Sequence, residues 1–237
     1  MALCRTIMHV VQPNDTFYRL AQKYKTTVPD IIMRNPGVNP YNLQVGTRLN
    51  ICAGQEQESP WKDELELNND MRQAWTQHAF WMQIYQNSLF NSLEDTEVVK
   101  RRLMQNPEDI ADVFDKFYSR AMVNQLTQLL EEHIRLAGEV MMAMRDGETQ
   151  KADQLERQWY QNAENIARLL SNANSEYSYE ELLRMLTRHL DMLKRQMTAE
   201  LNKEYENEID LFDENENQLM ELADYLTEGL LAQFYRS

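Results

Sequence analysis

The sequence predicts an α+β protein with a small βααβ domain over residues 1–54, a linker over 55–64, and an all-α up-down helical bundle over 65–237. Short apolar segments separated by Pro, Asn and Gly are concentrated in the first part, whereas the rest runs for long stretches without helix-breaking residues. The charge changes at the same place, from +4 over the first 54 residues to −18 over the remainder. These differences predict two domains with different partners.

The first domain is predicted to begin with a strand at His9–Gln12 and to end with a strand at Arg48–Cys52. We expect a helix over 16–24, capped by the Asp15 carboxylate, which would accept hydrogen bonds from the exposed N–H groups of the first turn. A second helix is expected to start near Thr27 and to stop at Asn35-Pro36-Gly37. The residues predicted to be buried by the two helices are Leu20, Ala21, Ile31 and Ile32.

Residues 8–53 resemble the LysM family. The matching positions are Val11-Gln12-Pro13-Asn14-Asp15-Thr16-Phe17, Leu20-Ala21, Tyr24, Asn35-Pro36-Gly37-Val38-Asn39-Pro40, Leu43, Gly46 and Leu49-Asn50-Ile51. Asn14 departs from the family, which usually has glycine there, although asparagine also tolerates a left-handed turn.

The resemblance implies binding of peptidoglycan or a chito-oligosaccharide, through a shallow groove for N-acetylglucosamine between two loops. Backbone N–H and C=O groups would form hydrogen bonds with the acetamido group. Apolar side chains would cover its methyl group and the face of the sugar ring. The residues implied are Asp15, Thr16, Phe17, Asn35, Pro36, Gly37, Val38, Asn39 and Leu43. Asp15 and Asn35-Pro36 also have a purely structural interpretation, as a helix cap and a helix stop, and the two interpretations are compatible. One shallow site should bind weakly, so retention would require several linked copies.

The bundle is predicted to contain five long and two short helices. The long helices are expected at 66–92, 117–145, 148–172, 179–200 and 203–235, and the short ones at 96–105 and 107–115. Asn106 should cap the second short helix, with Pro107 in its first turn. This region resembles an uncharacterised helical domain of endospore-forming bacteria, but no motif in it specifies an activity.

One polar residue interrupts the apolar stripe near the midpoint of each long helix. Because midpoints share a level in an up-down bundle, these residues are expected to form one polar layer. The predicted members are His78, His133, Asn162, His189 and Glu216. Three interpretations remain open: separate satisfaction by backbone or water, a closed hydrogen-bond network, or a transition-metal site. The metal ligands would be His78, His133, His189 and Glu216, with zinc, iron or manganese as the ion. Neither His133 nor His189 has a Glu three residues before it, so such a site would be mononuclear.

Several classes of partner and location are disfavoured. The acidic bundle lacks the clustered Lys and Arg that nucleic acid requires, and no segment is apolar enough to span a membrane. No secretory signal is visible, so we expect synthesis in the cytoplasm, with deposition at the spore or cell envelope. Cys4 and Cys52 could form a disulfide, but two free thiols are the favoured interpretation.

These features support two hypotheses. The first is a non-enzymatic protein that needs no cofactor, attaches to peptidoglycan, and uses its helical domain to form homo-oligomers or bind a protein partner. The alternative is a metal-dependent hydrolase or oxidoreductase with its site inside the bundle, localised by its LysM domain.

Overall fold

The computed structural model describes most of the chain as two compact units. The described residues are 5–12, 15–24, 26, 28–38, 43–53 and 60–235. The first unit covers residues 1–65 and the second covers 66–237. The first contains a two-stranded sheet with two helices, and the second contains only helices among its described residues, so the protein has the α+β class predicted from its sequence.

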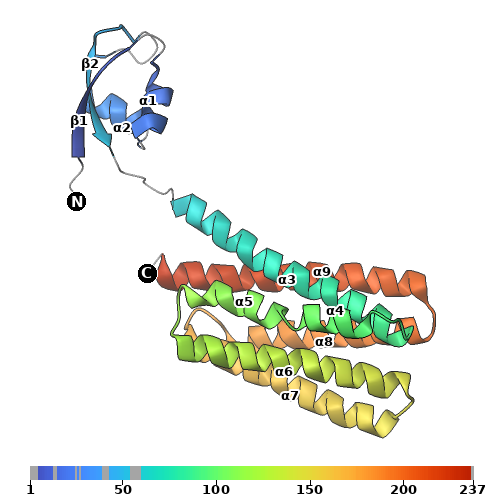
Figure 1. The fold of residues 1–237 in the computed structure, drawn as a ribbon. Helices are drawn as coiled ribbons and strands as arrows, with labels where there is room; N and C mark the ends of the chain where they lie inside the picture. Colours follow the sequence, from blue (N-terminus) through green and yellow to red (C-terminus); the bar gives the residue numbers. More distant parts are fainter. Residues whose placement is uncertain are drawn as a thin grey trace. The chain divides into compact units, whose positions relative to one another are not determined.

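In the first unit, strand β1 (Arg5–Val10) pairs antiparallel with β2 (Arg48–Ala53), and helices α1 (Phe17–Tyr24) and α2 (Val28–Arg34) lie between them in the chain. Figure 1 shows both helices on the same side of the sheet. β1 lies earlier than the predicted strand, because the ladder with β2 covers residues 5–10 and the strand ends at Val10.

Side chains of the two strands point alternately toward and away from the helices, and those that point toward the helices contribute to the core of this small unit. Leu49 and Ile51 of β2 are buried, whereas Met8 and Val10 of β1 are exposed. The core consists of Val11, Phe17, Leu20, Ala21, Ile31, Leu49 and Ile51. Leu20, Ala21 and Ile31 are buried as predicted, but the prediction for Ile32 is wrong, because its side chain is 38% exposed on α2.

Cys52, near the C-terminal end of β2, is buried and disulfide-bonded, which contradicts the favoured interpretation of two free thiols. Cys4, the only other cysteine in the sequence, lies outside the described residues.

The described residues from 60 onward form five long and two short helices. They are α3 (Pro60–Phe90), α4 (Thr96–Leu103), α5 (Asn106–Asp115), α6 (Arg120–Arg145), α7 (Thr149–Ala173), α8 (Tyr179–Leu201) and α9 (Tyr205–Phe234). α3 begins at Pro60, so part of the predicted linker is helical. α6 begins three residues later than predicted, because the Ser119 hydroxyl accepts a hydrogen bond from Met122 N and caps the helix there.

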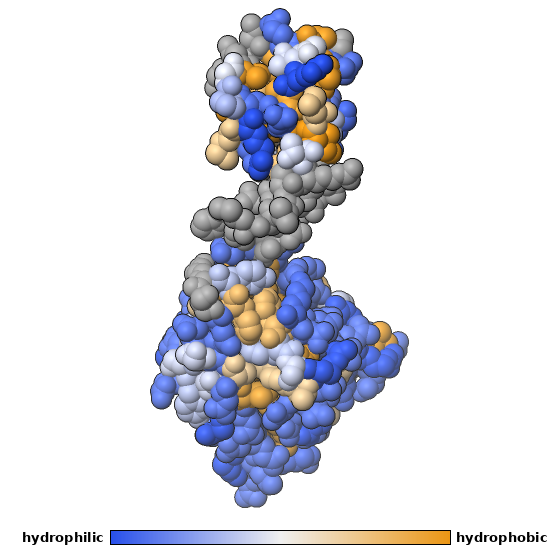
Figure 2. Space-filling view, turned by 90° about the vertical axis from the view of Figure 1, so that its left-hand side faces the viewer, coloured by the Kyte–Doolittle hydropathy of each residue, from blue (hydrophilic) through white to orange (hydrophobic). Residues whose placement is uncertain are grey.

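Figure 1 shows the helices running alongside one another, with α4 and α5 in succession along the bundle. α6 packs on α7 and α8 packs on α9 as antiparallel pairs joined by short turns. α3 lies against α9, where Arg72 makes two hydrogen bonds to the Asp224 carboxylate. Apolar side chains fill the space between these helices, while hydrophilic residues cover most of the face shown in Figure 2.

The turn between α7 and α8 is held against α9 by buried polar groups. The Asn174 amide donates to Gly229 O at 3.0 Å, and the Tyr177 hydroxyl donates to Leu226 O at 2.6 Å. Gly229 lets the Tyr177 ring approach the helix, because a Cβ at position 229 would lie 2.0 Å from Tyr177 Cε1. The close approach therefore requires glycine here although the position is helical.

We expect Gly229→Ala to destabilise the bundle by about 2 kcal/mol, because the new methyl group overlaps the Tyr177 ring. Urea unfolding followed by circular dichroism at 222 nm measures this. Asp213→Ala, at an exposed position of the same helix, is the control and should change stability by less than about 0.5 kcal/mol. Equal stabilities of the two variants would contradict the packing described for Tyr177.

Candidate functional sites

The first predicted site residue, Asp15, forms the turn between β1 and α1. Its Oδ2 atom accepts a hydrogen bond from Gln12 N at 2.7 Å and lies 2.8 Å from His9 Nε2. The prediction that Asp15 caps α1 is wrong: Thr16 Oγ1 accepts from Arg19 N and is the cap. The Asp15 carboxylate therefore stabilises the turn that precedes the helix.

His9 extends this contact into the unit. It is 7% exposed, and its Nδ1 atom lies 2.7 Å from the Tyr24 hydroxyl at the end of α1. The hydrogen bond from Gln12 N and the contact with His9 lower the pKa of Asp15 below its usual value of 3.8. Asp15 is therefore ionised at neutral pH, with its Oδ2 atom already engaged by the protein.

Asn35 ties the end of α2 to β2. Its Oδ1 atom accepts from Asn50 N at 2.8 Å, and its Nδ2 atom donates to Ile31 O at 2.7 Å and to Asn50 O at 2.9 Å. The side chain is 7% exposed. All of these hydrogen bonds are internal, so Asn35 positions the loop that follows it.

The nine predicted glycan residues divide by exposure. Phe17 and Asn35 are buried, and Asn39 lies outside the described residues. Gly37 is exposed and has a φ of 96°, which explains why glycine follows Asn35-Pro36 at the end of α2. The accessible members are Asp15, Thr16, Pro36, Gly37, Val38 and Leu43. Val38 and Leu43 are half-buried against the core of the unit, so each presents part of an apolar side chain to solvent.

Residues 9–51 match the family model of the LysM domain. The match implies binding to peptidoglycan or chitin-type glycans. No curated protein and no solved structure matched the chain. The resemblance of the bundle to a domain of endospore-forming bacteria therefore has no support from these comparisons. The LysM domain is the part of the chain whose ligand class follows from its family.

In the bundle, three histidines meet at one level of the core. His78 of α3, His133 of α6 and His189 of α8 are each at most 4% exposed. The ring centroids of His78 and His189 are 5.6 Å apart, and those of His133 and His189 are 6.2 Å apart. The predicted polar layer therefore exists, with these histidines and Asn162 among its members.

Each histidine pairs with an asparagine from a later helix. The Nδ1–Oδ1 distances are 2.9 Å for His78 with Asn106, 2.9 Å for His133 with Asn162 and 2.8 Å for His189 with Asn215. The prediction of Glu216 was wrong by one residue, because Asn215 faces the core and Glu216 is half-buried. The prediction that Asn106 caps α5 was also wrong: it is buried in the first helical turn with its side chain on His78.

The asparagines determine which nitrogen carries the imidazole proton. Asn106 Nδ2 donates to Ala74 O at 2.9 Å, and Asn162 Nδ2 donates to Leu129 O at 3.0 Å. Each of these carbonyls lies four residues before the paired histidine. Since the amide nitrogen faces a carbonyl, Oδ1 faces the ring, and the histidine must donate from Nδ1. Nε2 is then an acceptor in these neutral rings.

The acceptor atoms of the three histidines differ in their surroundings. Trp159 Nε1 donates to His133 Nε2 at 3.2 Å. Nε2 of His78 and Nε2 of His189 have no hydrogen-bond partner among the residues that the structure describes. Burial lowers the pKa of His78 and His133 to about 3 and that of His189 to about 4, so all three rings are neutral at pH 7.

The predicted metal ligands are not brought together as a set. Glu216 is outside the buried layer, and His133 Nε2 already accepts the Trp159 proton. Across the part of the chain that the structure describes, no group of three or more His, Cys, Asp or Glu side chains is arranged to hold a metal ion. The layer therefore follows most closely the first interpretation, because each histidine has a separate partner at Nδ1, although this partner is an asparagine rather than backbone or water.

A second buried polar cluster was missed by the sequence analysis. The Glu208 carboxylate is 5% exposed and accepts hydrogen bonds from the amides of Gln83 at 2.7 Å, Gln196 at 2.9 Å and Gln86 at 3.3 Å. Three amide donors stabilise the carboxylate in place of a cation. The glutamines lie on α3 and α8, so only the assembled bundle reveals the cluster.

The three buried histidines predict a steep pH dependence of bundle stability. Their pKa values are lower in the folded state than the usual 6.5, so the unfolded state binds more protons below that pH. The contribution of these neutral histidines to the free energy of unfolding is fully present above pH 6.5. It is lost as the pH falls toward the pKa values of the folded state. Between pH 7 and pH 5 we expect a loss of roughly 2 kcal/mol per histidine.

His133→Gln should reduce this loss by about one third, measured by urea unfolding at both pH values and followed by helical circular dichroism. His9→Gln, in the LysM domain, is the control and should leave the pH dependence of the bundle unchanged. A wild-type pH dependence in His133→Gln and in His189→Gln would contradict the assignment of neutral buried rings.

Proposed function

We propose that this protein is a non-enzymatic binding protein that attaches to an N-acetylglucosamine-containing polymer, with peptidoglycan as the natural ligand. The observation that carries the proposal is the LysM match over residues 9–51. The arrangement of the turns supports it, because internal hydrogen bonds of Asp15 and Asn35 hold the two loops that would flank the sugar. Rigid loops reduce the entropy lost on binding.

Recognition would use the surface that these internal bonds leave available. Val38 and Leu43 offer partly exposed apolar side chains for the acetamido methyl group, and the exposed backbone beside Gly37 offers polar groups for the amide. A single small apolar contact is worth about 1 kcal/mol, so one domain should bind weakly. Several copies on one polymer would provide the retention that one copy lacks.

The helical bundle is proposed to associate with itself or with a protein partner, and the envelope or spore surface is the proposed location because the polymer lies there. Its histidines support a structural role over a catalytic one. They are at most 4% exposed and engaged with asparagines, so a polymer cannot reach them. Among the described residues, no helix is long and apolar enough to cross a membrane.

The test is sedimentation of the full chain with insoluble peptidoglycan and, separately, with chitin. We expect enrichment on peptidoglycan, competed by soluble chito-oligosaccharide. Val38→Gln should reduce the binding constant about fivefold, because it removes an apolar contact of about 1 kcal/mol. Met8→Gln is the matched control, since Met8 is an exposed apolar side chain of β1 outside the predicted groove.

Thermal unfolding of both variants would show that the LysM domain remains folded. Equal binding by Val38→Gln and the wild type would contradict the prediction that Val38 lines the glycan-binding groove. The absence of sedimentation with either polymer would refute the proposed function.

A further inference from the structure

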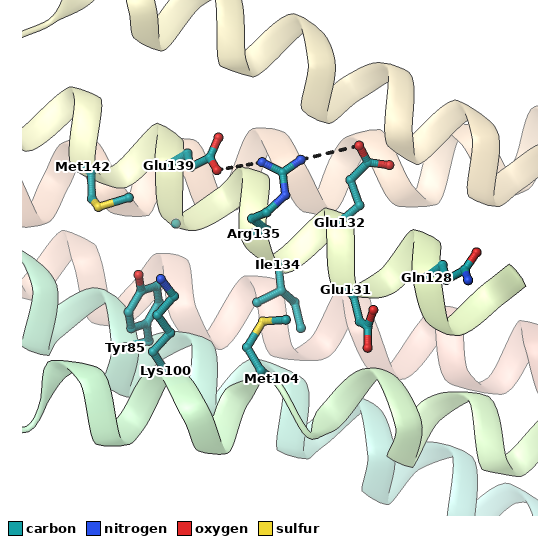
Figure 3. Close-up of a pocket in the computed structure, with 11 residues that line it drawn as sticks. Tyr85, Lys100, Met104, Gln128, Glu131, Glu132, Ile134, Arg135, Glu139 and Met142 are labelled. Carbon is teal, nitrogen blue, oxygen red and sulfur yellow. Dashed lines mark hydrogen bonds and ion pairs between the residues drawn. The ribbon is translucent and has the colours of Figure 1, made fainter. Parts of the chain in front are cut away.

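A surface cavity of about 520 Å³ lies between α4 and α6 of the bundle. Its lining includes Tyr85, Lys100, Met104, Glu131, Ile134 and Gly138. Figure 3 shows Tyr85 and Lys100 toward one end, Ile134 and Met104 in the middle, and Glu131 with Gln128 toward the other end. The cavity therefore has two polar ends separated by an apolar floor.

Tyr85 places a hydroxyl group at the first end of the cavity. The residue is 2% exposed and lines the cavity, yet its hydroxyl makes no hydrogen bond to any described residue. Gly138 lies directly opposite, since a Cβ there would be 3.0 Å from Tyr85 Oη. Burial raises the pKa of Tyr85, so the group remains a neutral hydroxyl that can donate to a ligand.

The charged residues at the two ends of the cavity are not paired with other charged residues that the structure describes. Lys100 and Glu131 form no ion pair with any described residue, whereas Arg135 between them is 2.6 Å from Glu139 and 3.5 Å from Glu132. Lys100 can bind a carboxylate together with Tyr85, and Glu131 can bind an amine. Because both signs of charge line the cavity, the arrangement favours a zwitterion over a multiply charged anion.

The spacing along α6 indicates the size of the ligand. Gly138, opposite Tyr85, and Glu131 are seven residues apart in a helix that rises 1.5 Å per residue, a separation of about 10 Å. Three extended residues span about the same length. The apolar side chains of such a peptide would lie over Ile134 and Met104.

We propose that this cavity binds a zwitterionic small molecule of tripeptide length, with its carboxylate at Lys100 and Tyr85 and its amine at Glu131. This activity is separate from glycan binding and uses none of the LysM residues. The bundle would thereby bind short peptides while the LysM domain binds a sugar polymer.

The test is an NMR titration of the full chain with trialanine, trialanine amide and N-acetyl-trialanine. We expect trialanine to bind with a Kd on the order of 1 mM and to shift the amide signals of Ile134 and Gly138. Blocking either terminus should weaken binding roughly two- to fivefold, the range of one partly exposed ion pair. These peptides contain no sugar, so the result is independent of the LysM domain.

Lys100→Gln and Glu131→Gln identify which end of the peptide each residue holds. Lys100→Gln should weaken trialanine roughly two- to fivefold but leave the affinity of the amide unchanged, and Glu131→Gln should do the same for the N-acetyl peptide. Lys203→Gln, at an exposed lysine in the turn after α8, is the matched control and should have no effect. The proposal is overturned by an absence of shifts up to about 20 mM trialanine, or by equal weakening of all three peptides in both variants.

Discussion

The bundle depends on three hydrogen bonds in which a buried histidine donates to the Oδ1 atom of an asparagine on another helix. Two of the bonds join consecutive helices, α6 with α7 and α8 with α9, and the third joins α3 to α5. The three rings then meet one another near the centre. An uncharged pair avoids the large cost of burying a charge and still fixes how the two helices face each other. Shifting one helix by a residue would turn its histidine or asparagine away from the core.

A second hydrogen bond, to a backbone carbonyl, accompanies each histidine–asparagine pair. In two of the pairs, the asparagine amide also donates to the carbonyl four residues before the histidine. In the third, Gln218 donates to the equivalent carbonyl, Met185 O, at 2.9 Å, in place of Asn215. The carbonyl four residues before a histidine lies one turn away on the same face of the helix, so a single amide can bridge both groups. Two of the pairs therefore use one asparagine for both contacts, and the third divides the contacts between Asn215 and Gln218.

The sequence predicted the fold class, the number of helices and the level of the polar layer, because these follow from local patterns of 3.6 residues and from turn residues. It predicted Asn162 as a member of this layer, but it did not predict Asn106 and Asn215 as members or the pairing of each histidine with an asparagine. Asn106 had a sufficient local explanation as a helix cap, and Glu216 was preferred to Asn215 because a stripe traced in steps of three or four residues tolerates an error of one position. The spacing of 28, 29 and 26 residues between each histidine and its asparagine was visible, but it has meaning only once the pairing of helices is known.

The predicted glycan-binding residues show a different limit of prediction from sequence. Sequence similarity locates the two loops that are predicted to flank a glycan, but it does not separate residues predicted to contact the glycan from residues that hold the loops in place. Asn35 makes three hydrogen bonds within the domain and is buried, and Asp15 is engaged by Gln12 and His9. A polar side chain with its donors and acceptors already satisfied gains little from a new ligand, because each new bond requires breaking an internal one. Under the proposed function, contact with a glycan would therefore involve accessible backbone and partly exposed apolar side chains such as Val38.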